Sequence, residues 1–81
     1  MDQTTIRTKL IEVMATIFGV DGQLITENAS MDTIETWDSL KHMKLIIALE
    51  QEFGIEFDDA EVVEMLSFRL IELAVGQKVA V

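Results

Sequence analysis

Apolar residues at helical spacing mark the first part of the chain. They recur three or four positions apart, the spacing that puts side chains on one face of an α-helix. The repeat consists of Ile6, Leu10, Val13, Met14 and Ile17. It predicts an amphipathic helix over residues 4–18. We expect Thr4 or Thr5 to cap its beginning and Gly19 to close its end.

The helical pattern fades between Gly19 and Trp37. Asp21-Gly22 is a turn signal, and the residues that follow favour hydrogen bonds between side chains and the local backbone. We therefore expect a long loop here, and a loop of this length in a compact domain is usually functional. Four apolar residues are expected to hold it against the core: Leu24, Ile25, Met31 and Ile34.

The helical pattern returns at Asp38, a good N-cap residue, and runs to Phe53, where Gly54 stops it. This second helix has two apolar faces. Its predicted core face consists of Leu45, Ile46, Leu49 and Phe53. A second stripe consists of Leu40, Met43 and Ile47. A helix on the surface of a monomer needs one apolar face, so the second stripe indicates a docking surface. Cover for an apolar ligand, or a helix buried on most sides, would explain it as well.

Two shorter helices complete the pattern. After an extended link, Asp58 or Asp59 is expected to cap a short third helix over residues 59–65. Ser67 is placed to cap a fourth helix, and we expect Gly76 to end it. The order predicts an all-α fold, a four-helix bundle of three main helices plus a short third one. A long loop joins the first two helices, and residues 1–81 form a single domain.

Composition limits the chemistry that the chain offers. It has 81 residues, and 49% of them are hydrophobic, which is enough for a core and excludes a disordered acidic tail. It has no cysteine, which excludes disulfides and thiolate metal sites and is typical of a reducing, cytoplasmic location. The residues at the start of the chain do not resemble a signal peptide, and no apolar run is long enough for a membrane helix.

A formal net charge of -9 argues against nucleic acid and anionic membrane surfaces as partners. It favours protein partners with basic patches, although solubility alone would explain it equally well. We also considered a calcium loop of the EF-hand type around Asp21-Gly22. The ligand pattern fails, because Ile17, Gly19 and Asn28 fall at positions that need other ligands. No metal site is predicted; weak, nonspecific cation binding by the acidic segment 50–64 remains open.

Ser39 stands at the beginning of the second helix, where we expect it to be exposed. Free backbone N–H groups and the positive end of the helix dipole suit a phosphate ester there better than an unassisted nucleophile. His42 lies one turn away, but a Ser-His pair needs a third orienting group and an oxyanion hole, and no glycine-rich elbow is present. We therefore predict no catalytic residue and interpret His42 as a solvated helix residue.

The run Trp37-Asp38-Ser39-Leu40, followed by an apolar helix, resembles the phosphopantetheine attachment motif of acyl carrier proteins. Residues 45–55 are similar to the second helix of that family and its exit. Residues 58–65 are similar to its short third helix, and residues from Ser67 onward to its last helix. The resemblance covers nearly the whole chain, and size, acidity and helix order agree with it.

The resemblance implies that Ser39 receives 4′-phosphopantetheine from coenzyme A through a separate phosphopantetheinyl transferase. The chain would then be a monomeric carrier that holds an acyl group as a thioester and delivers it to acyl-loading and acyl-using enzymes. Asp38 would position the site, and Leu40 would dock the partner. The implied partner-binding residues are Leu40, Lys41, Met43, Lys44 and Ile47. The implied acyl-chain pocket consists of Ile55, Val62, Val63 and Met65.

Three features depart from the family pattern. Lys41 and Lys44 occupy a region that is usually acidic, which predicts partners other than the housekeeping fatty acid enzymes. Trp37 replaces a small residue, which is similar to carriers of specialised fatty acid or polyketide pathways and to carriers of amino acids; packing against the core is its simplest interpretation. The proline before the third helix is absent at Phe57-Asp58, which predicts a looser link. A peptidyl or aminoacyl carrier and a non-carrier interaction domain remain alternatives.

Overall fold

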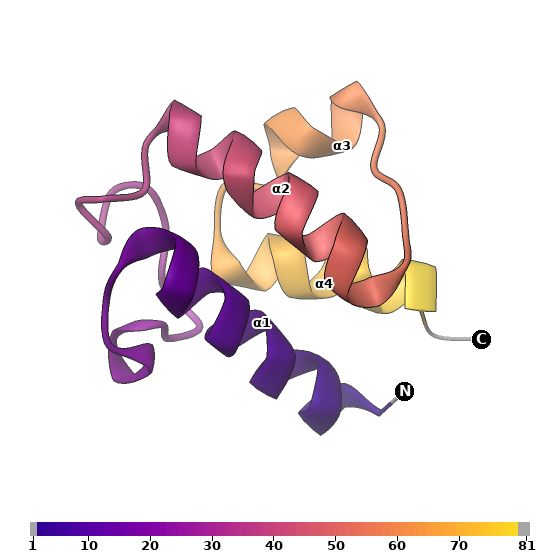
Figure 1. Cartoon of the computed structure of the whole chain (residues 1–81), viewed down its shortest axis with the longest axis horizontal. Helices are drawn as coiled ribbons and strands as arrows, with labels where there is room; N and C mark the ends of the chain where they lie inside the picture. Colours follow the sequence, from indigo (N-terminus) through magenta and orange to yellow (C-terminus); the bar gives the residue numbers. More distant parts are fainter. Residues whose placement is uncertain (1, 80–81) are drawn as a thin grey trace.

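The computed structural model describes residues 2–79, which form a bundle of four α-helices (Figure 1). The helices are α1 (Gln3–Phe18), α2 (Ser39–Phe53), α3 (Asp59–Glu64) and α4 (Phe68–Val79), and a 3-10 turn η1 (Gly22–Leu24) lies in the first loop. The long loop joins α1 to α2, as the sequence predicts. The all-α fold with a short third helix is therefore confirmed.

The cap of the first helix lies two to three residues before the predicted threonines. Asp2, in extended conformation, is the N-cap, and its carboxylate accepts the backbone N–H of Thr5 at 2.7 Å. That hydrogen bond holds the pKa of the Asp2 carboxyl below its ordinary value. The predicted caps Thr4 and Thr5 are wrong because both lie inside the first turn. At the other end Gly19 takes the left-handed conformation, with φ of 67°, and closes the helix as expected.

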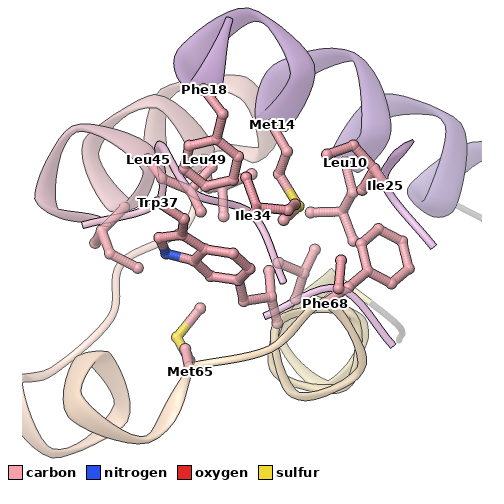
Figure 2. Close-up of a cluster of buried hydrophobic side chains, with 14 of the residues drawn as sticks. Leu10, Met14, Phe18, Ile25, Ile34, Trp37, Leu45, Leu49, Met65 and Phe68 are labelled. Atoms are coloured by element: carbon pink, nitrogen blue, oxygen red, sulfur yellow. The ribbon is translucent and has the colours of Figure 1, made fainter. Parts of the chain in front are cut away.

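The core draws on every helix except α3 and on the long loop (Figure 2). The buried apolar residues of the helices are Ile6, Leu10, Met14, Phe18, Leu45, Ile46, Leu49, Phe68, Ile71 and Val75. The loops add Ile25, Ala29, Ile34, Trp37 and Met65. Burying one large side chain of this kind contributes about 1.5–3 kcal/mol. The long loop is thus a structural part of the bundle.

The loop is held by some of the residues that the sequence predicts. Ile25 and Ile34 are buried, and Met31 packs against the core with part of its surface exposed. Leu24 is 61% exposed, so its predicted anchoring role is wrong. It ends the single turn of η1, and the inward position falls to the next residue, Ile25. The loop also binds α4, because Phe68 donates its backbone N–H to the Ala29 carbonyl at 2.9 Å.

The last helix continues past the glycine that was expected to end it. Ser67 caps it as predicted, since its hydroxyl oxygen accepts the backbone N–H of Leu70 at 3.3 Å. Gly76 does not take the left-handed conformation, and the helix runs to Val79. Val79 packs against the core, and Lys78 forms an ion pair with Glu61 of α3 at 3.0 Å. These contacts stabilise the turn that a glycine would otherwise weaken.

An ion pair joins the first helix to the last. Arg7 of α1 binds both carboxylate oxygens of Glu72 on α4, at 2.8 and 2.9 Å, and also reaches Glu27 in the loop at 3.1 Å. Glu72 is buried, and its hydrogen bonds with Arg7 hold the pKa of its carboxyl below the ordinary value. The Arg7 guanidinium also lies 5.7 Å from the ring centre of Phe68. One cation therefore ties α1, α4 and the loop together.

Candidate functional site

Ser39 is the first residue of α2 and is exposed, as predicted. The preceding residue, Asp38, is the N-cap, and its carboxylate accepts the backbone N–H of Lys41 at 2.8 Å. The Asp38 carbonyl accepts the N–H of His42 at 2.8 Å, which begins the helical ladder. The N–H groups of the first turn and the helix dipole give this position a partial positive charge. Ser39 therefore offers an accessible hydroxyl where a phosphate ester would be stabilised.

The surface beside Ser39 is hollowed, with a volume of about 290 Å³. The lining residues are Met31, Ser39, His42, Met43, Val62, Val63 and Leu66. They come from the long loop, from the first turns of α2, and from α3 and the residue pair that follows it. None of them carries a full charge when His42 is neutral, so the hollow suits an aliphatic group.

The hollow brings together two of the four residues that were predicted to form an acyl-chain pocket. Val62 and Val63 line the hollow, whereas Ile55 packs against the core and does not reach it. Met65 is fully enclosed and lies beside Trp37 in the core (Figure 2). It occupies the C-cap of α3, where the chain turns inward. Met31 and Leu66 also line the hollow, and the sequence did not predict either of them there. Met31 was assigned to the core, and Leu66 follows the predicted third helix.

His42 is buried, with 5% of its surface exposed, so its interpretation as a solvated residue is wrong. Trp37 donates its indole N–H to His42 Nδ1 at 3.1 Å, and His42 Nε2 lies 2.9 Å from the Val62 carbonyl oxygen. Because Nδ1 accepts, the proton of the neutral ring is on Nε2, which donates to Val62. Both nitrogens are thus engaged, and neither is free to activate Ser39.

Trp37 packs as its simplest interpretation predicts. Its ring stacks on Phe18 with the centroids 4.9 Å apart and lies among the core residues (Figure 2). The indole N–H, which would be costly to bury without a partner, is satisfied by the imidazole of His42. The residue before Asp38 therefore anchors the end of the loop and the beginning of α2 to the core.

The second apolar stripe of α2 faces solvent. Leu40, Met43 and Ile47 are 66%, 50% and 54% exposed. The opposite stripe is buried at Leu45, Ile46 and Leu49 and partly buried at Phe53. The alternative of a helix buried on most sides is therefore wrong. Lys44 is exposed and Lys41 half-buried on the same part of the helix, so cations accompany the apolar stripe.

Residues 2–79 offer neither a candidate metal centre nor a helix that could span a membrane. Within that part of the chain, no group of three histidine, aspartate or glutamate side chains is arranged to hold a metal ion. Asp21, which suggested a calcium loop, instead caps η1 by accepting the backbone N–H of Gln23 at 2.8 Å. None of the helices in the described residues has the length and apolar character that crossing a membrane requires.

Comparison with known proteins identifies the family of the chain. Residues 8–72 match the model of the phosphopantetheine attachment site family. An acyl carrier protein of Thermosynechococcus vestitus is 32% identical over 80 residues, which cover 99% of each chain. Acyl carrier proteins of Syntrophobacter fumaroxidans and Rubrobacter xylanophilus are 33% and 39% identical over 61 residues, 75% of each chain. The chain therefore belongs to the acyl carrier protein family.

Membership defines the type of chemistry. Proteins of this family carry their cargo and do not catalyse its conversion, and the cofactor is covalently attached 4′-phosphopantetheine. The residues of this chain fit such a group: an exposed hydroxyl at a helix N-terminus for the phosphate and an apolar hollow beside it. The absence of cysteine is consistent with this chemistry, because the cofactor itself supplies a thiol.

Proposed function

We propose that the chain carries an acyl group as a thioester on 4′-phosphopantetheine attached to Ser39 and delivers it to partner enzymes. The observation that supports Ser39 is a comparison of the three serines. The hydroxyl oxygens of Ser30 and Ser67 accept local backbone N–H groups, and both residues are half-buried. Ser39 is exposed, at the beginning of a 15-residue helix and at the edge of the apolar hollow.

The neighbours of Ser39 have distinct roles in this proposal. Asp38 holds the first turn of α2 and so fixes the backbone position from which the Ser39 side chain projects. The backbone N–H groups of that turn stabilise the charge of the phosphodiester. The bound group supplies a flexible arm that ends in a thiol. Since His42 is engaged by Trp37 and Val62, attachment needs a separate phosphopantetheinyl transferase.

The hollow favours an acyl cargo over an aminoacyl one. Its side chains are methionine, valine and leucine apart from Ser39 and His42, and they offer no partner for an ammonium group. We place this carrier in the cytoplasm, where coenzyme A is the source of the arm, and expect it to act as a monomer. Nothing in residues 2–79 specifically favours a peptidyl or aminoacyl carrier.

Partner choice follows from the exposed stripe of α2. We propose that Leu40, Met43 and Ile47 make the apolar contact with partner enzymes, and that Lys41 and Lys44 meet acidic groups on them. A partner with a basic patch at this place would be repelled, which is an effective way to discriminate between partners. The chain would accordingly serve a specialised pathway and not the housekeeping synthesis of fatty acids.

Intact-mass measurement tests the attachment site directly. The wild-type chain is incubated with coenzyme A and a promiscuous phosphopantetheinyl transferase. We expect one added 4′-phosphopantetheine on the wild type and on the control Ser67→Ala, and none on Ser39→Ala, which should keep its helical circular dichroism. An unmodified wild type across several transferases, or modification of Ser39→Ala, would overturn the proposal.

Charge reversal tests the partner proposal. We expect Lys41→Glu with Lys44→Glu to improve use of the loaded chain by housekeeping fatty acid enzymes, because two repulsive contacts become attractive. The matched control is Lys9→Glu with Arg69→Glu, which changes the net charge equally but lies on α1 and α4. If both double variants were used equally better by these enzymes, net charge alone would explain the effect. If Lys41→Glu with Lys44→Glu brought no improvement, partner exclusion would be refuted.

A further inference from the structure

The third helix is held to the bundle by few contacts. It has six residues, none of which is buried in the core. A helix this short is not stable by itself, so its position depends on tertiary contacts. The extensive contacts between helices join α1 to α2 and α4 and do not include α3. In Figure 1, α3 lies at the edge of the bundle, away from α1.

The buried C-cap residue Met65 anchors the end of α3, and three further interactions of different strength hold the helix itself. Val62 packs against the core with part of its side chain exposed. Lys78 pairs with Glu61, but both side chains are partly exposed, and surface ion pairs contribute little. The hydrogen bond from His42 Nε2 to the Val62 carbonyl, 2.9 Å long, comes from a buried ring. Among the described residues, this partly buried bond is the one hydrogen bond that joins α2 to α3, and partial exclusion of water strengthens it.

The imidazole is in turn oriented by the core. Trp37 is buried and stacked on Phe18, so its indole N–H has a fixed direction. It donates to His42 Nδ1 at 3.1 Å, which leaves the ring proton on Nε2, where it faces Val62. A rigid indole, an oriented imidazole and the backbone of α3 thus form one hydrogen-bonded chain that ends at the hollow.

We propose that His42 is a positioning residue: held as its Nε2–H tautomer by Trp37, it fixes α3 as one wall of the apolar hollow beside Ser39. Val62 and Val63 of α3 line the hollow together with Met31 of the long loop and Met43 of α2. Release of α3 removes that wall and exposes an aliphatic group held there. The sheltering of a tethered group rests on the proposed function, whereas the positioning of α3 does not.

The positioning is tested on the unmodified chain by NMR. We expect long-range ¹H–¹⁵N spectra to show Nε2 protonated in His42. The hydrogen bonds of the Val62 and Met65 amides begin and end α3. In His42→Leu, hydrogen exchange at these two amides should accelerate on the order of tenfold beyond any change at Leu49. His42→Gln, whose amide both donates and accepts, should restore much of the protection.

Ile6→Val is the matched control for general destabilisation. It trims a buried core side chain on α1 and leaves the bonds from Trp37 to His42 and from His42 to Val62, so exchange should rise throughout the bundle without singling out α3. An Nδ1-protonated ring, or equal acceleration in α3 and α2 of His42→Leu, would overturn the proposal. Exchange confined to α3 in His42→Leu supports it.

The sheltering is tested on the loaded chain. Octanoyl-phosphopantetheine serves as an aliphatic probe, and intact mass first confirms that it is attached. We expect the methyl resonances of Val62, Val63 and Leu66 to shift on loading in the wild type, and to shift much less in His42→Leu, with Leu73 as the control. Equal shifts in both proteins, or none in the wild type, would overturn the sheltering role. A chain that takes up no arm at all would refute the proposed function instead.

Discussion

At the beginning of α2, buried and exposed residues are close neighbours in the chain. Trp37 is buried, Asp38 caps the helix, Ser39 is exposed, and His42 is buried one turn later. The alternation follows from the N-cap, whose extended backbone separates an inward residue on one side from an outward one on the other. The site therefore depends on a cap that keeps Ser39 outside while its neighbours hold the helix in place.

Removing the cap should weaken the fold measurably. Asp38→Ala leaves the Lys41 N–H without its acceptor and should lower the free energy of unfolding by about 1 kcal/mol. Asp38→Asn keeps an acceptor and should lose much less. Urea denaturation measures both, with Asp59→Ala, one residue inside α3, as the control. Equal losses in the alanine and asparagine variants of Asp38 would contradict this account.

At the level of single residues, the sequence predicts the features that depend only on residues nearby in the chain. The caps Asp38, Asp58 and Ser67 each bind a backbone N–H three residues ahead, and all three were expected. The burial of His42 was not expected, because its partner Val62 is twenty positions further on and nothing local marks the pair. The exposure of Leu24 was missed for a similar reason, since a single 3-10 turn decides which residue faces the core.

At the level of elements, glycines occupy two kinds of position, the end of a helix and its interior. Gly19 and Gly54 take left-handed conformations, with φ of 67° and 64°, and end α1 and α2. Gly76 lies inside α4 with helical geometry. Sequence alone assigns all three to helix ends, because the contacts of Val79 and Lys78 that extend α4 depend on the tertiary structure.

Alanine substitutions at two of these glycines should have opposite effects. An added Cβ meets no atom within 4 Å at Gly54 or Gly76, so backbone conformation alone decides. Gly76→Ala should raise the free energy of unfolding by about 0.5–1 kcal/mol, and Gly54→Ala should lower it by about 1 kcal/mol. Thermal and urea unfolding measure both changes. A loss of stability in Gly76→Ala would show that the helix ends there.

The third helix shows how far elements can be predicted. Asp58 and Glu61 form a reciprocal capping box, with bonds of 2.8 and 3.1 Å, so the beginning of α3 follows from the sequence. The bond from the Asp58 N–H, followed by the ion pair with Lys78, lowers the pKa of the Glu61 carboxyl. The placement of α3 depends on His42 and Lys78, which belong to other helices, and no local pattern indicates it.

At the level of the whole molecule, a few cations join separate elements of a strongly acidic chain. Arg7 joins Glu72 and Glu27, Lys9 pairs with Glu52 at 3.2 Å, and Lys78 pairs with Glu61. Arg7 and Glu72 are 65 positions apart and connect the first helix to the last. Fold class and helix order follow from the apolar pattern, whereas these long-range pairs emerge only in three dimensions.

The Arg7–Glu72 pair predicts a pH dependence. Because the pKa of Glu72 is lowered in the folded chain, its contribution is present above the ordinary glutamate value of 4.5 and is lost as the pH falls through the folded-state value. Glu72→Gln should therefore be less stable than the wild type at neutral pH, and the difference should narrow in acid.

Denaturation of both proteins between neutral and acid pH measures this difference. Glu64→Gln removes the same charge from an exposed position of α3 and serves as the control for net charge. Comparing the variants cancels the general effect of a net charge of -9. If the difference in stability between Glu72→Gln and the wild type stayed constant in acid, the contribution of the pair would not depend on the ionised carboxylate.

The only tryptophan of the chain lies in the core, two residues before Ser39 and in contact with the imidazole that reaches α3. Its fluorescence is thus an intrinsic optical probe of the site. Emission should be blue-shifted while the indole is enclosed, and it should respond when the neighbouring imidazole moves. Attachment, release and exchange of cargo can then be followed in real time by stopped-flow fluorimetry without an added dye.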